Sequence, residues 1–271
     1  MIGHCYIQGV EKYIKAIYVG VNGVAKRITR PSGIYKYDRL VPPLSVAREE
    51  LAATTIGGNA LFAGGDSDDS ESQSQVDAYN SSLTRSTLTG LSVARSGLEA
   101  TTVGNYALFA GGVVRGSTYK STVDAYNSSL TRSRPTALSV TTYCLAATTV
   151  GNYALFAGGL GDTWYDTVDV YDKSLTKITP VHLSACKYGC KGATIDKKYA
   201  LFFGGNIGDS SEPRVDAFDS SLVRTIIAGP NDERIFLAAT TVGNYALFAG
   251  GYDYDSSPRT KDEVYAYTYE L

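Results

Sequence analysis

The sequence predicts an all-β fold made of five copies of one four-stranded unit, and three observations support this prediction. A nonapeptide close to GNYALFAGG recurs along the chain at intervals of 46 or 47 residues. A constant period of this length is typical of repeat architectures, in which each copy forms one structural unit. A complete copy contains four short β-type runs, and the 3.6-residue periodicity of an amphipathic helix is found nowhere in the chain. The five nonapeptides end at Gly65, Gly112, Gly159, Gly205 and Gly251.

One copy, residues 97–136, shows the whole unit. An Ala/Thr-rich run, Leu98–Val103, leads through a Gly-Asn turn into the apolar run Tyr106–Ala110, which ends in a glycine pair. After a polar loop, the alternating run Val123–Tyr126 leads through an Asn-Ser-Ser turn into a last strand, Leu130–Thr136. Four antiparallel strands repeated at this spacing are the blades of a β-propeller. The small first run fits the innermost strand, because bulky side chains would collide where the blades converge.

A count of the strands predicts how the ring closes. The chain ends after the fifth copy of the third strand, Val264–Tyr269, so the last blade lacks its fourth strand. Shifting Thr84–Ser92 back by 47 residues lands on Tyr37–Ser45 without a gap. We therefore expect Tyr37–Leu44 to pair as the outer strand of the last blade and to remove its open edge. The alternative is a six-bladed propeller in which residues 1–44 form a degenerate first blade.

The first 33 residues stand outside the repeat, so we expect an N-terminal β-hairpin extension at 1–33 and a propeller at 34–271. In Ala16–Thr29, Asn22-Gly23 lies between two β-rich runs. Asn-Gly supplies the positive φ angles of a two-residue type I′ turn, which predicts a β-hairpin. We interpret this extension as an element that attaches the protein to a larger assembly.

Composition argues against several classes of partner. The net charge is −2 and the pI is near 5.7, so the chain lacks the basic face that nucleic-acid binding requires. It has no long apolar run, which predicts no membrane insertion. The opening MIGHCYIQGVEKY has no basic region followed by an apolar core. We therefore expect synthesis in the cytoplasm without a signal peptide.

The residues that usually carry catalysis or bind metals are sparse. The only histidines are His4 and His182, and no nucleophile, base and orienting group occur together. Cys186 and Cys190 lie four residues apart, but no further ligand completes a zinc site. The acidic loop Asp66–Glu71 lacks the spacing of a known calcium loop. The sequence thus predicts no metal, no cofactor and no catalytic residues.

The glycine pair after an apolar strand, followed by VDAY, resembles kelch repeats, and the resemblance covers Ile34–Leu271. The family's tryptophan is absent, and a basic residue stands in its place in four of the repeats. The near-identical copies and the YVGVNGVAK hairpin resemble kelch-repeat proteins encoded in prophages of Gram-positive bacteria. That resemblance implies a phage structural or host-recognition role and a virion-associated location. The family's tyrosine corresponds to Tyr79, Tyr126, Tyr171, Phe218 and Tyr267, and the basic replacements are Arg85, Arg132, Lys177 and Arg224.

Two sets of loops differ between copies, while the other two are nearly constant. The variable sets are the loops after the glycine pairs and the blade-to-blade loops. Up-and-down strand order places both variable sets on one face, and a constant scaffold presenting variable loops is the usual layout of a recognition surface. The alternative is that these loops drift because nothing restrains them.

These loops supply the candidate ligand-binding residues. Aromatic rings beside charged groups suit stacking on sugars or anchoring in a protein partner. Three arginines recur at one repeat position, where we expect a ring at the channel mouth that grips a carboxylate. The candidates are Arg48, Glu49, Arg95, Tyr119, Tyr143, Trp164, Tyr165, Tyr188, Arg234, Tyr252 and Tyr254.

The function predicted from these features is non-catalytic recognition of a cell-surface glycan or protein. The alternative is a sugar-acting enzyme, similar to an epimerase or mutarotase, that uses the Arg/Glu ring at the channel mouth. The resemblance to kelch-like sialic acid epimerases implies an acidic-sugar substrate for that alternative.

Overall fold

The structure is a computed structural model. It describes residues 5–7, 10–12, 17–21, 24–28, 41–69, 71–115, 118–205, 214–230, 234–253 and 258–269. The chain divides into two compact units, Met1–Val41 and Pro42–Leu271, and we describe each by itself. The described part of both units contains strands and turns but no helix. None of the described residues therefore forms a helix that could span a membrane.

The N-terminal unit contains two antiparallel hairpins. Strand β1 (Cys5–Ile7) pairs with β2 (Val10–Lys12), and β3 (Ile17–Val21) pairs with β4 (Val24–Ile28). Val21 lies opposite Val24, which leaves a two-residue connection of the length predicted for Asn22-Gly23. The turn itself lies outside the described residues. The pairing of β1 with β2 was not predicted from the sequence.

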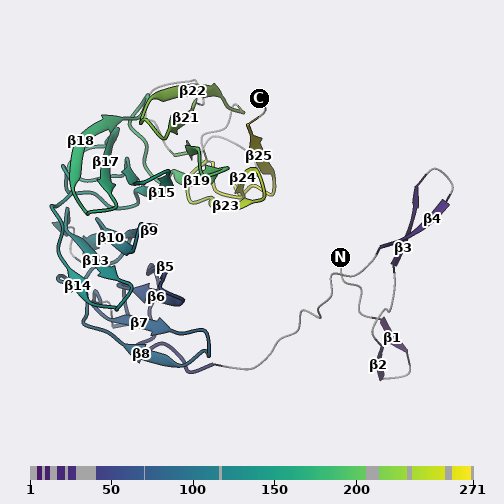
Figure 1. Cartoon of the computed structure of the whole chain (residues 1–271), viewed down its shortest axis with the longest axis horizontal. Helices are drawn as coiled ribbons and strands as arrows, with labels where there is room; N and C mark the ends of the chain where they lie inside the picture. The colour runs from purple at the N-terminus through teal and green to yellow at the C-terminus, as the bar shows by residue number, and fades with distance from the viewer. Residues whose placement is uncertain are drawn as a thin grey trace. The chain divides into compact units, whose positions relative to one another are not determined.

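The second unit is a five-bladed β-propeller, as predicted, with four-stranded antiparallel blades except for the last (Figure 1). Blade 1 comprises β5 (Ala52–Ile56), β6 (Asn59–Ala63), β7 (Val76–Tyr79) and β8 (Arg85–Thr87). Blade 2 comprises β9 (Glu99–Val103), β10 (Tyr106–Ala110), β13 (Val123–Asn127) and β14 (Arg132–Ser133), and blade 3 comprises β15 (Ala146–Val150), β16 (Tyr153–Ala157), β17 (Thr167–Asp172) and β18 (Lys177–His182). Blade 4 comprises β19 (Lys191–Ile195), β20 (Tyr199–Phe203), β21 (Arg214–Asp219) and β22 (Arg224–Ala228), and blade 5 comprises β23 (Ala238–Val242), β24 (Tyr245–Ala249) and β25 (Val264–Thr268).

The first strand of each blade is innermost, as the small side chains of its Ala-Thr-Thr copies predicted; these strands are β5, β9, β15, β19 and β23 (Figure 1). Threonine hydroxyls hydrogen-bond between neighbouring inner strands: Thr54 Oγ1 lies 2.8 Å from Thr102 Oγ1, and Thr101 Oγ1 lies 2.8 Å from Thr149 Oγ1.

The last strand of blade 2, β14, is shorter than the predicted strand Leu130–Thr136. Leu130 belongs to the preceding turn, with a φ of 61°, and Pro135 has no N–H to pair.

The glycine pair recurs because neither position has room for a side chain. Gly111 and Gly112 have φ angles of 69° and 106°, which L-residues with a Cβ rarely adopt. A Cβ on Gly111 would lie 2.7 Å from Thr142 O, and one on Gly112 would lie 2.7 Å from Ser96 O. The blade-to-blade loops therefore pass directly over the pair.

Each blade has a leading face, toward the next blade, and a trailing face, toward the preceding one. Ile56 and Val76 on the leading face of blade 1 pack with Ala107, Phe109 and Tyr126 on the trailing face of blade 2. The same pattern repeats at the next three interfaces, except that the leading face of blade 4 also contains Phe203. The four interfaces between neighbouring blades are therefore similar in their packing.

The trailing face of blade 1 and the leading face of blade 5 lack such a neighbour, and Figure 1 shows these two blades at the two ends of an arc. On the leading face of blade 5, Val242 is 59% exposed and Val264 is 57% exposed. Their counterparts in blade 2, Val103 and Val123, are 2% and 1% exposed. On the trailing face of blade 1, Tyr79 is half-buried, although its counterparts in blades 2 to 4 are fully buried.

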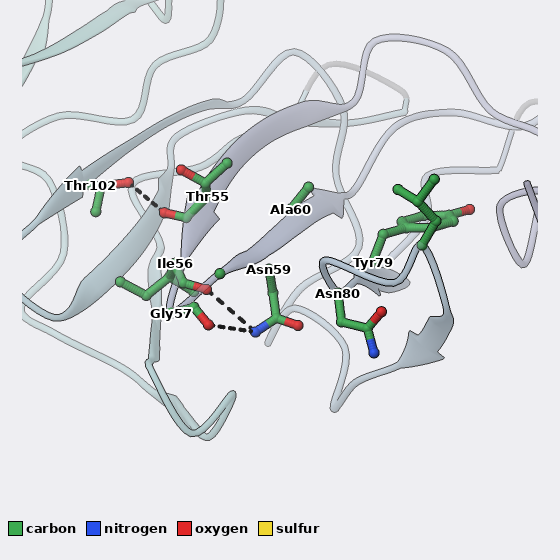
Figure 2. A pocket seen from close by; sticks show the side chains of 10 residues that line it. Thr55, Ile56, Gly57, Asn59, Ala60, Tyr79, Asn80 and Thr102 are labelled. Carbon is green, nitrogen blue, oxygen red and sulfur yellow. Dashed lines mark hydrogen bonds between the residues drawn. The ribbon is translucent and has the colours of Figure 1, made fainter. Parts of the chain in front are cut away.

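A cavity of about 530 Å³ lies on this trailing face of blade 1, beside the turn between β5 and β6 (Figure 2). Thr55, Ala60 and Tyr79 are among the residues that line it. At the interface between blades 1 and 2, Ile56 packs with Tyr126, the counterpart of Tyr79. The cavity therefore lies where a side chain of a neighbouring blade packs at the internal interfaces, and we do not interpret it as a ligand site.

The predicted closing strand falls mostly outside the described residues. Residues 38–40 correspond to β8 and are not described, while Val41–Leu44 form no strand. Pro42 O accepts a hydrogen bond from Tyr79 Oη at 2.8 Å, and Thr89 O accepts the equivalent bond from Tyr126 Oη at 2.8 Å. Pro42 thus follows the path of a normal blade-to-blade link, and closure by the preceding residues stays a prediction.

Deleting residues 1–30 is expected to leave a folded, soluble propeller, because the compact second unit begins at Pro42. Its melting temperature should stay within about 2–4 °C of the full chain, equivalent to about 1 kcal/mol for a domain of this size. Deleting residues 1–44 should lower the melting temperature further and cause aggregation, because it also removes the predicted closing strand. Calorimetry and light scattering compare the two variants, and equal damage by both would contradict the assignment of 1–33 as an extension.

Candidate functional site

The two variable loop sets lie side by side, as strand order predicted. In four blades a backbone bridge joins the blade-to-blade loop to the loop after the glycine pair: Glu49–Asp66, Ser96–Val113, Tyr143–Leu160 and Ile235–Tyr252. These bridges are reciprocal hydrogen bonds of 2.9 to 3.0 Å. We call the surface formed by these two loop sets the variable face.

A chain of backbone hydrogen bonds runs around the inner edge of the variable face. Gly97 N donates to Glu50 O, Cys144 N to Gly97 O, Gly189 N to Cys144 O and Phe236 N to Gly189 O, at 3.0 to 3.2 Å. These five residues, which we call the rim, all have φ angles between 50° and 71°. Glycine adopts this conformation freely, whereas each non-glycine residue costs of order 1 kcal/mol or more. Glu50, Cys144 and Phe236 therefore keep side chains at the rim despite backbone strain.

An aromatic row follows the rim from blade 2 to blade 5. The ring centroids of Tyr119 and Tyr143 lie 5.2 Å apart and the rings stack with an interplanar angle of 13°. Tyr143 and Tyr188 lie 5.9 Å apart, and Tyr188 meets Phe236 edge to face at 5.9 Å. Gly97 makes room for the row, because a Cβ there would lie 3.3 Å from Tyr143 Cδ2. The three tyrosines are half-buried and Phe236 is 57% exposed, so the rings pack partly against the protein and remain accessible to a ligand.

An ion pair lies just below the rim. Lys191 Nζ contacts Glu99 Oε1, joining the first residues of β19 and β9. Burial acts to lower the pKa of Lys191, but the charge of Glu99 and its hydrogen bond outweigh burial, and the pKa is raised. The two side chains are 34% and 24% exposed, so solvent reaches both groups.

The thiol of Cys144 is kept neutral by its surroundings. Burial, followed by the negative charge of Glu50, raises the pKa of Cys144 to about 11. A thiolate is the nucleophilic form of cysteine, and this environment opposes it at neutral pH. Cys144 is therefore part of the packing at the rim. Cys186 and Cys190 are also free thiols in the structure.

The three recurring arginines are enclosed within their blades. Arg95 Nη1 lies 3.0 Å from Asp124 Oδ2, and Arg95 also donates to the carbonyl oxygens of Gly111 and Phe109. The side chain of Arg48 pairs with Asp77 at 2.9 Å and is fully buried. Arg234 pairs with Glu263 at 3.1 Å, and its own side chain is 1% exposed. The sequence predicted that these groups lie at the channel mouth, but in the structure they tie each loop to its own blade, so they are not part of the candidate surface.

The other predicted residues lie apart from the aromatic row. Trp164 is 38% exposed and is bridged through its backbone to Leu160. Tyr165 packs on its own loop, where a Cβ on Gly161 would lie 2.9 Å from its ring. The Tyr252 hydroxyl accepts a hydrogen bond from Arg259 at 3.0 Å, and Glu49 is exposed beside the rim. Tyr254 lies outside the described residues.

Sequence reasoning missed Lys191 and Phe236 as site residues. Lys191 and Glu99 occupy one repeat position, which is alanine in the other three copies, Ala52, Ala146 and Ala238. Two opposite charges at a repeat position that is otherwise alanine could have indicated this ion pair from the sequence. Phe236 stands where two other copies have glycine, and its positive φ makes that replacement costly.

The fold and the site together define a five-bladed β-propeller with an accessible aromatic row on its variable face. Comparisons of the chain with protein-family models and with curated proteins found no match.

Proposed function

We propose that the protein is a non-catalytic recognition propeller that binds a cell-surface glycan or protein through the variable face. The observation that carries this proposal is the aromatic row of Tyr119, Tyr143, Tyr188 and Phe236. Large, rigid rings supply contact area at little conformational cost, which is why aromatic residues dominate binding surfaces.

The rim and the loop bridges support this proposal. The bridges hold loops of different sequence on a common frame, so the face is organised before a ligand arrives. Preorganisation lowers the entropic cost of binding. Strain at Cys144 and Phe236 is the kind of backbone outlier that clusters at binding sites.

We place the protein in the structural or host-recognition part of a phage or prophage particle, with residues 1–33 attaching it to the assembly. This placement rests on the kelch-like repeat and on the likeness of the YVGVNGVAK hairpin to prophage-encoded proteins. The two hairpins of the first compact unit are consistent with a separate attachment element.

The enzymatic alternative gains no support from the described residues. The recurring arginines are buried and paired within the blades, and the surroundings of the rim residue Cys144 keep its thiol neutral. We therefore do not carry the sugar-acting enzyme further.

Replacing Tyr143 and Tyr188 together with serine is expected to weaken binding at least about tenfold, because aromatic hot spots contribute 2 kcal/mol or more. The measurement is binding of labelled protein to a glycan array and to intact Gram-positive cells. The matched control replaces Tyr106 and Tyr153, half-buried tyrosines at the constant-turn ends of β10 and β16.

Equal loss in both double variants, or no loss in either, would count against the variable face. Hits from the array are then incubated with the protein and examined for chemical change. Turnover of a bound sugar would contradict the non-catalytic assignment.

A further inference from the structure

We infer that the ligand of the variable face is a neutral, hydroxyl-rich glycan and not an acidic sugar, an inference that rests on the proposed function. Three features carry it: the charge around the rim, the chemistry of the Glu99–Lys191 pair and the shape of the aromatic row.

The charge bordering the row does not favour an anion. The carboxylates of Glu49 and Glu50 are exposed at the rim, and Glu99 lies just below it. Among the described residues of the rim and the inner strands beneath it, Lys191 is the accessible cation, and its charge is already engaged by Glu99. An acidic sugar would therefore meet more negative than positive charge, at a cost that low ionic strength increases.

The loops further out carry charges of both signs. Arg115 and Lys120 flank Tyr119 on blade 2. Arg115 N donates to Ser72 Oγ at 3.0 Å, which places it beside the acidic loop of Asp68 and Asp69 on blade 1. Among the described residues of these two blades, the opposing charges form no basic patch that would attract an anion toward the row.

The ion pair can bind a hydroxyl without being broken. A hydroxyl donates one hydrogen bond and accepts others, so one sugar OH can donate to Glu99 and accept from Lys191. A carboxylate or sulfate has no proton to donate to Glu99, so it can only accept from the N–H groups of Lys191 that Glu99 does not use. Because both side chains are partly exposed, neighbouring hydroxyls on one ring can reach the pair directly.

The aromatic row fits an extended chain of sugars. Successive ring centroids lie 5.2, 5.9 and 5.9 Å apart, so the four rings form one continuous apolar row that crosses several blades. The apolar C–H faces of sugars pack on aromatic rings, while their edges carry the hydroxyls that a few placed polar groups select. A protein partner would instead need a broader patch with a buried centre.

The inference is tested with pairs of oligosaccharides that differ only in charge. Isothermal titration compares neutral glucose and galactose oligomers with their uronic-acid counterparts, and a glycan array compares sialylated with desialylated chains. The expected result is binding of at least one neutral oligomer, with its acidic counterpart at least about tenfold weaker. Glu99→Gln, which removes the charge of the acceptor, should weaken neutral binding several-fold while melting stays near wild type.

The outcomes separate this inference from the proposed function. Tighter binding of the acidic member, lost in the Tyr143/Tyr188 double variant, would overturn the inference and leave the recognition face standing. Glycan binding unaffected by any variable-face substitution would overturn both. Absence of binding to every oligosaccharide would overturn the inference, whereas Tyr143-dependent binding to protease-sensitive cell surfaces would identify a protein ligand.

Discussion

Replacing Arg95 with alanine is expected to lower the free energy of unfolding by about 3–5 kcal/mol, the usual cost of removing one partner of a buried ion pair. The substitution would leave the Asp124 carboxylate buried and would remove hydrogen bonds to the carbonyl oxygens of Val93, Phe109 and Gly111. Urea unfolding followed by tryptophan fluorescence or circular dichroism measures the loss.

The chain provides matched controls for this substitution. Lys187 occupies the same position in blade 4, where its Nζ lies 3.0 Å from Asp216 Oδ2, so Arg95→Lys should recover much of the lost stability. Arg132 Nε lies 3.9 Å from Asp124 and is partly exposed, so Arg132→Ala should cost only about 0–1 kcal/mol. If Arg95→Ala were as mild as Arg132→Ala, the internal role assigned to the arginine would be incorrect.

Two valines at one repeat position should respond very differently to aspartate. Val103→Asp buries an unpaired charge between blades 2 and 3 and is expected to cost several kcal/mol or to prevent folding. Val242→Asp changes the leading face of blade 5, which is exposed in the structure, and should cost less than about 1 kcal/mol unless the predicted ring closure covers that face in solution. Both variants are compared by urea unfolding, with Val103→Ala as an uncharged reference.

The Val242 variant also tests the ends of the arc. The leading face of blade 5 and the trailing face of blade 1 have the same chemistry as the two faces joined at every internal interface. A loss from Val242→Asp as large as that from Val103→Asp would mean that the face is covered in solution. The cavity beside Tyr79 would then be the place to look for the covering side chains, by substituting Ala60 with a bulkier residue.

Several features of the fold were determined by the sequence alone. The period, the four strands of each unit and the five blades could be inferred because each repeat carries its own local signals, and five copies repeat them. The glycine pair marks the place where a blade-to-blade loop crosses a strand end, a local steric demand that Gly111 and Gly112 display directly. Strand order likewise placed both variable loop sets on one face, since alternating strands must turn at alternate ends.

The tertiary structure decided which recurring residues face the ligand and which face the core. A column of arginines has the same sequence signature whether it grips a substrate or ties a loop to its blade, and only the burial of Arg95 against Asp124 separates the two cases. The contact between Glu99 and Lys191 joins residues 92 positions apart on different blades, so no local pattern specifies it. The aromatic row likewise exists only because the curvature of the propeller brings loops from successive repeats to one rim.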